Sequence, residues 1–139
     1  MKYTRRDLSL LLPLLAAADA SAQKPTLPSK TYAFDDLPVK KNAANTSRAV
    51  LNGAIHDGCP LEMHITEIAP GMAPHAPHHH GHDEMIIIRQ GTLAVTINGK
   101  TANLGPGSVA FAASGEEHGW KNVGTTPAKY FVMALGEDK

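Results

Sequence analysis

The stretch that decides the fold reads HHHGHDE from residue 78 to residue 84, and a short apolar run separates it from Gly91. Alternate side chains of an extended chain point the same way, so we expect His78 and His80 to share one face and His79 to point away. Glu84 follows four residues after His80 and adds a carboxylate to the two imidazoles. The spacing predicts a place where one cation could collect all three side chains.

A second stretch, GSVAFAASGEEHGWKN from residue 107 to residue 122, contributes another imidazole, that of His118. The two stretches together offer three neutral nitrogen donors and one carboxylate. Such a mixed set suits a divalent first-row transition metal better than calcium or magnesium, which prefer oxygen ligands. A hydrogen-bonded network without metal is the alternative, and ligand spacing in both stretches favours the metal.

The two stretches resemble the signature motifs of the cupins, His-x-His...Glu...Gly and Gly...Pro-x-Gly-x-x-His-x-x-x-Asn, and the resemblance covers about residues 60–135. It implies that His78, His80, Glu84 and His118 are metal ligands. The likeness also points to a homodimer.

Two positions depart from the family pattern. Members usually have a glycine six positions before the first histidine, where this chain has Met72, with Gly71 one position earlier. The proline of the second motif is Ala113. We therefore expect a longer approach loop and a looser turn, with every ligand retained.

Short apolar or alternating segments with turn signals between them predict strands after residue 46. Asn98-Gly99 is a strong hairpin signal, because both residues tolerate positive φ. No segment after residue 22 has a helical period. We predict an all-β jelly-roll barrel, the double-stranded β-helix of the cupins, with an extended N-terminal arm. The predicted strands are Arg48–Ile55, Leu61–Ile68, Glu84–Gln90, Thr92–Ile97, Lys100–Leu104, Ser108–Ala112, His118–Val123 and Lys129–Leu135.

Strand alternation also predicts the lining of the pocket. If Glu84 and His118 point inward, their same-face neighbours do too, and Phe111 belongs to the more apolar face of its strand. His64 is taken as an ordinary packed or surface histidine. The residues predicted to line the pocket or to contact the ligand residues are His75, His82, Ile86, Ile88, Phe111 and Trp120.

Composition bounds the class of protein. The chain has 139 residues, enough for one core and too few for two. Its 13 basic and 13 acidic side chains cancel, and no basic run exists beyond the N-terminus, which argues against nucleic-acid binding. A single cysteine, Cys59, excludes an internal disulfide.

Residues 1–22 have the features of an export signal: Arg5 and Arg6, an apolar run, and the small residues Ala20-Ser21-Ala22. The paired arginines favour the twin-arginine version over a general secretory signal. Cleavage after Ala22 leaves 10 basic and 11 acidic groups. We expect a periplasmic or secreted protein without a membrane span.

Residues 23–45 are rich in proline and lysine and predict an extended arm. The plainer interpretation is a loosely held segment. The alternative is that the apolar patches around Phe34 and Val39 pack along the domain or against a second copy, since we expect a homodimer.

These patterns predict an exported metal-dependent enzyme for a small oxygen-rich metabolite, with oxidoreductase or dioxygenase chemistry favoured over isomerase or lyase chemistry. If the protein binds its metal in the cytoplasm before export, as a twin-arginine signal implies, manganese, iron or nickel is favoured over zinc or copper. Oxalate chemistry is disfavoured, because it wants a basic anchor and Arg89 is expected to point outward. A non-catalytic periplasmic binding module is the alternative, supported by five histidines between His75 and His82.

Overall fold

The computed structural model describes residues 24–138, and the expected export signal lies outside the described residues. The described part has one 3-10 turn, η1 (Phe34–Asp36), and otherwise only strands and connections. The strands are β1 (Val39–Lys41), β2 (Asn45–Ala54), β3 (Pro60–Ile68), β4 (Asp83–Gln90), β5 (Leu93–Ile97), β6 (Lys100–Leu104), β7 (Val109–Ala112), β8 (His118–Asn122) and β9 (Ala128–Leu135).

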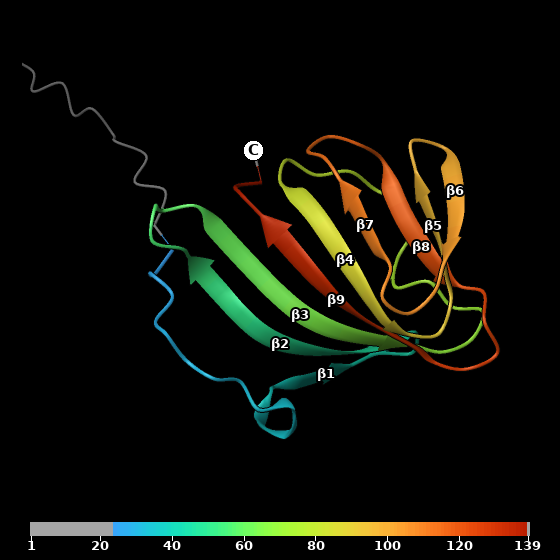
Figure 1. Cartoon of the computed structure of the whole chain (residues 1–139), viewed down its shortest axis with the longest axis horizontal. Coiled ribbons are helices and arrows are strands. Elements are labelled where there is room, and N and C mark those ends of the chain that lie inside the picture. Colours follow the sequence, from blue (N-terminus) through green and yellow to red (C-terminus); the bar gives the residue numbers. More distant parts are fainter. Residues whose placement is uncertain (1–23, 139) are drawn as a thin grey trace, which may run out of the picture.

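The strands form two antiparallel sheets that face each other as the walls of a barrel (Figure 1). One sheet has the order β1-β2-β3-β9-β4-β7, and the other has the order β6-β5-β8. The predicted all-β jelly roll is confirmed. Seven of the eight predicted strands match within one residue at each end, and β2 starts three residues earlier than predicted.

The core lies between the two sheets and comes from alternate positions of the inner strands, as the pleat requires. Full burial of a valine, leucine or isoleucine side chain stabilises the fold by about 1.5–3 kcal/mol relative to an exposed position. The buried cluster consists of Ile68, Ile86, Ile88, Leu93, Val95, Trp120, Ala128, Tyr130 and Val132.

Turn residues fix the strand register. Asn98 and Gly99 both have positive φ, 47° and 75°, which confirms the predicted β5–β6 hairpin. Gly91, the last residue of the first motif, has φ 82°, and a Cβ there would lie 2.7 Å from the Cα of Ala128. Asn122 is fully buried, and its amide donates to the carbonyls of Ile68 and Thr126.

The arm is attached to the domain, so the prediction of a loosely held arm is wrong for its described residues. The Leu27 amide donates to the Ala54 carbonyl (2.8 Å), and the Ala54 amide donates to the Pro25 carbonyl (2.9 Å). Leu37 is buried, and β1 adds a strand to the edge of the larger sheet beside β2 (Figure 1). These backbone hydrogen bonds hold the arm against the domain, although its sequence has no regular hydrophobic period.

No helix within residues 24–138 is long and apolar enough to cross a membrane.

Candidate metal centre

The structure brings the four predicted ligands together from three places in the chain. His78 and His80 lie in the loop before β4, Glu84 lies on β4, and His118 opens β8. The ligand atoms of His78, His80 and His118 lie within 4.8 Å of one another. The Glu84 carboxylate oxygens lie 3.4 Å from His80 Nε2 and 3.3 Å from His118 Nε2. We call these four residues the His/Glu cluster.

Hydrogen bonds to backbone carbonyls join the two motifs. His78 and His118 exchange both amide-to-carbonyl hydrogen bonds, of 3.0 and 2.9 Å. The Gly115 amide donates to the His80 carbonyl, and the Ser114 hydroxyl donates to the Gly81 carbonyl. Residues 78–80 form no regular strand, only a single bridge between His78 and His118. These hydrogen bonds, rather than a regular strand, turn His78 and His80 toward the same point.

Two ring tautomers are set by backbone carbonyls. His80 Nδ1 lies 2.9 Å from the His82 carbonyl, and His118 Nδ1 lies 2.9 Å from the Glu116 carbonyl. A carbonyl oxygen can only accept, so each ring carries its proton on Nδ1. The Nε2 lone pairs are then free and point toward Glu84. Such outer hydrogen bonds are what orient metal-binding histidines in proteins.

The cluster fits a divalent cation better than a hydrogen-bonded network. One buried polar atom on each member has no hydrogen-bond partner: His78 Nδ1, His80 Nε2, Glu84 Oε1 and His118 Nε2. Each such atom costs about 1–3 kcal/mol when it stays unsatisfied. A cation satisfies all of them at once, and ligands about 2.1 Å from one ion lie about 3 Å apart, near the separations observed here.

Burial keeps the nearby histidines neutral, the form that binds metal. Burial lowers the pKa of His78, and the neighbouring His75 and His118 lower it further. Burial also lowers the pKa of His82, whose ring stacks on His80 with centroids 3.6 Å apart.

An inner cavity of about 250 Å³ opens beside Glu84. Strand alternation decides which residues reach it, so β3 contributes His64 and Thr66 and β9 contributes Tyr130 and Val132. The remaining lining residues are Lys40, Asn42, Asn45, Ser47, Pro74, His75 and Trp120. The rim is polar and the far wall is aromatic and aliphatic.

A small apolar hollow of about 10 Å³ also touches Glu84 and His118. Ile86, Ala110 and Ala112 are among its walls. It is too small for more than about one small molecule.

The structure places the predicted pocket residues in different surroundings. His75, Ile86 and Trp120 line these spaces as expected, while His82 packs on the His80 ring. Ile88 lies in the hydrophobic core. Phe111 was assigned to the pocket wrongly: it is 51% exposed, because Ala110 and Ala112 form the inner face of β7. The bulkier apolar residues of β7 face outward, contrary to the usual pattern.

Several lining residues were missed from the sequence. His64 and Tyr130 face the cavity, and Lys40 supplies a basic group at its rim. Alternation along Leu61–Ile68 could have identified His64 once its inward face was known. Lys40 could not be found, because nothing in the arm predicted a strand at residues 39–41. Lys40 thus supplies the basic anchor that oxalate or another carboxylate would need.

The fold and cluster can now be compared with known proteins. The family model described as "Cupin domain" matches residues 64–134. The chain belongs to the cupins. No curated protein matches this cupin.

Three solved structures are similar to this cupin at TM-scores of 0.66 to 0.67. An RmlC-like cupin from Shewanella frigidimarina is 16% identical and covers 83% of this chain and 95% of its own. KdgF from a Halomonas species is 17% identical, with 80% and 97% covered. A predicted oxalate decarboxylase from Thermotoga maritima is 18% identical, with 78% and 100% covered. At these identities the likeness shows the fold alone.

The alanine in place of the family proline leaves the second motif intact. The amide of Ala113 donates to a Glu116 carboxylate oxygen at 3.2 Å, a bond that proline could not make. The Glu116 amide donates back to the Ala113 carbonyl at 3.1 Å. These bonds hold the turn that a proline would otherwise stiffen.

Proposed function

We propose that this cupin binds one divalent transition metal ion through His78, His80, Glu84 and His118 and acts on a small oxygen-rich molecule in the inner cavity. The observation that carries the proposal is the set of four buried polar atoms, one on each cluster residue, that have no hydrogen-bond partner. A bound divalent ion would supply Lewis-acid chemistry, or redox chemistry if it were iron or manganese.

The chain's own residues set what the cavity accepts. Lys40 can anchor a carboxylate or another oxyanion at the rim. The Tyr130 hydroxyl is buried, and burial raises its pKa, so it remains a neutral donor. Trp120 and Val132 form an apolar wall that excludes water. The cavity therefore suits a small hydroxy acid, keto acid or enediol.

We favour dioxygen-dependent oxidation over isomerisation or elimination. Four protein ligands would leave two positions of a six-coordinate ion open, enough for a substrate and dioxygen together. The test is dioxygen consumption by metal-loaded protein offered oxalate, malate, a keto acid and catechol in turn. Turnover without dioxygen consumption would move the proposal to isomerase or lyase chemistry.

Metal analysis of single variants tests the site itself. His80→Ala and His118→Ala should each lose stoichiometric metal, since each removes one nitrogen donor. His79→Ala is the matched control, because His79 is exposed and lies in the same histidine run outside the cluster. Full metal content in both cluster variants would contradict the proposed ligand set.

A non-catalytic binding module is the second candidate. The exposed His75 and His79 lie beside the cluster and add imidazoles that suit capture of copper, nickel or zinc. Loaded protein that turns over none of the offered compounds, and that takes up more than one copper or zinc ion per chain, would favour this function.

Export bears on which metal is bound. A twin-arginine signal at Arg5 and Arg6 implies folding and loading in the cytoplasm, which lets manganese, iron or nickel be trapped ahead of copper or zinc. Changing both arginines to lysine should then block export. Normal export of that variant, with copper or zinc in the protein, would support the binding module.

A further inference from the structure

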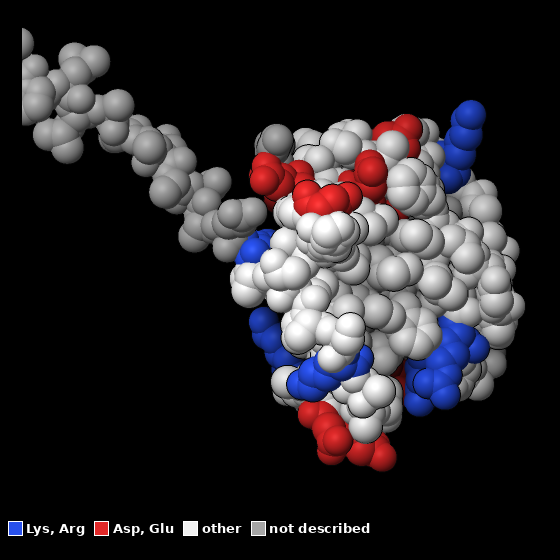
Figure 2. Space-filling model, turned by 60° about the vertical axis from the view of Figure 1, so that its left-hand side comes forward, with Lys and Arg blue, Asp and Glu red and all other residues white. Residues whose placement is uncertain are grey.

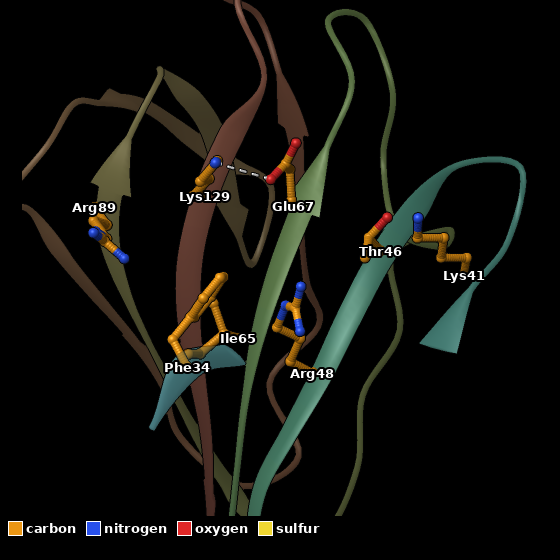
Figure 3. A pocket seen from close by; sticks show the side chains of 8 residues that line it. All are labelled: Phe34, Lys41, Thr46, Arg48, Ile65, Glu67, Arg89 and Lys129. Atoms are coloured by element: carbon orange, nitrogen blue, oxygen red, sulfur yellow. Dashed lines mark ion pairs between the residues drawn. The ribbon is translucent and has the colours of Figure 1, made fainter. Parts of the chain in front are cut away.

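A second hollow, of about 310 Å³, lies on the opposite face of the six-stranded sheet from the inner cavity. We call it the outer pocket. The two share no residue, because strand alternation sends neighbours to opposite faces. On β1, Lys41 faces the outer pocket and Lys40 faces the inner cavity. The outer pocket is lined by Phe34, Lys41, Thr46, Arg48, Ile65, Glu67, Arg89 and Lys129 (Figure 3).

Positive charge is concentrated at this pocket. Arg48 and Arg89 are the only arginines after residue 22, and both line it. Lys41 and Lys129 add two more cations, and Glu67 is the one carboxylate of the lining. Figure 2, which brings the side of β1 and β2 forward, shows basic side chains over the lower part of this face, with acidic ones above them and at the bottom edge. The pocket thus has an excess of three positive charges in a protein that is neutral overall.

The arm holds one of these arginines in place. The Arg48 guanidinium lies over the Phe34 ring, 4.4 Å from its centroid, and donates to the Leu37 carbonyl at 3.4 Å. A guanidinium stacked on a ring keeps other N–H groups free for an oxyanion, at a smaller entropic cost on binding.

The other charged residues of the pocket differ in whether they form an ion pair. Lys129 pairs with Glu67 at 3.1 Å, so these two largely cancel (Figure 3). Arg89 and Lys41 make no ion pair with any residue in 24–138, and both side chains are exposed. Arg48, Arg89 and Lys41 thus line one hollow without a paired carboxylate, with Arg48 between the other two (Figure 3).

We propose that the outer pocket is a binding site for a small organic oxyanion, a carboxylate or a phosphate ester, that carries a flat apolar group. Arg48, stacked on Phe34, holds the anionic end, and Arg89 and Lys41 add positive charge on either side of it. Phe34 and Ile65 form the apolar wall against which the flat group packs. The site is separate from the inner cavity and is independent of any metal there.

Arginine side-chain NMR of the full-length protein tests this site directly. The chain has four arginines, so Arg48→Lys and Arg89→Lys assign the two Nε–H signals of the pocket, and Arg5 and Arg6 provide internal references. Phenyl phosphate and benzoate, titrated at constant ionic strength, should shift both pocket signals to saturation. Their relative affinities distinguish a phosphate site from a carboxylate site. Inorganic phosphate should bind more weakly than phenyl phosphate, because it cannot use the apolar wall.

Charge variants supply the control. Arg89→Gln and Lys41→Gln should each weaken phenyl phosphate binding, Arg89→Gln by about tenfold. Lys100→Gln removes the same charge from exposed β6 and should leave the affinity unchanged. Pocket signals that do not move, or equal weakening by Lys100→Gln, would overturn the proposal. So would a change of mass in Arg89→Gln by light scattering without anion binding, because the surface would then be a contact between copies.

Discussion

The proton on His78 competes directly with a metal ion. Because burial lowers the pKa of His78, the ring stays neutral below its ordinary pKa of about 6.5. Metal occupancy should therefore hold as the pH falls through that value and drop between about pH 6 and 5. Metal content after dialysis across this range checks the expectation. Complete loss of metal above pH 6.5 would contradict it.

His64 gives the metal-free protein a pH-dependent stability. Burial lowers its pKa in the folded state, partly opposed by Glu62 and Glu84. The unfolded chain takes up its proton near pH 6.5, so this contribution to stability is complete above that pH and declines as the pH falls toward the lower folded pKa. His64→Gln should flatten the loss of unfolding free energy between pH 7 and 5, measured with urea. His56→Gln, at an exposed turn, should leave the slope unchanged.

Residue types and spacing were enough to predict which side chains form the cluster, but not which nitrogen of each ring faces it. The tautomers of His80 and His118 depend on carbonyls at His82 and Glu116, whose direction follows the path of the loops. Phe111 failed for a related reason: hydrophobicity alone was used to choose the inner face of β7, and the cluster needs small residues beside it.

At the scale of elements, Gly53 governs how the arm meets β2. A Cβ at Gly53 would lie 2.6 Å from the Pro25 carbonyl oxygen and 2.7 Å from the Leu27 side chain. Gly53→Ala should therefore displace residues 24–27 and destabilise the fold by about 1–3 kcal/mol. Faster hydrogen exchange at Leu27 and Ala54 would report the displacement.

Gly105→Ala is the matched control for this change. A Cβ at Gly105 would meet nothing within 4 Å, and its φ needs no glycine. Unchanged exchange in Gly53→Ala would contradict the expectation, because the Cβ would then fit without displacing the arm.

Strands were predicted well wherever alternation and turn residues agreed, as at the Asn98-Gly99 hairpin. The arm was not, because β1 is three exposed residues whose pairing with β2 depends on contacts far along the chain. Lys40 and Lys41 are adjacent in the sequence, and only the pairing of β1 with β2 sends them to opposite faces of the sheet.

For the whole molecule, we expect a homodimer that uses the exposed edge at β1. Val39 is 47% exposed on this short edge strand, where backbone groups are free to pair with another chain. Val39→Asp should shift the mass measured by light scattering from two chains toward one. Val123→Asp changes an equally exposed valine elsewhere and should keep the dimer. A wild-type monomer at micromolar concentration would contradict the expectation.

Trp120 is the only tryptophan of the chain, and its ring lies nearly parallel to that of His118, with centroids 6.2 Å apart. The protein thus contains its own optical reporter, because all indole fluorescence originates beside the His/Glu cluster. An ion with unpaired d electrons should quench this emission, whereas zinc, with a filled d shell, should leave most of it. A single unlabelled titration can therefore distinguish manganese, iron, nickel or copper from zinc, and a ligand entering the inner cavity should shift the same emission band.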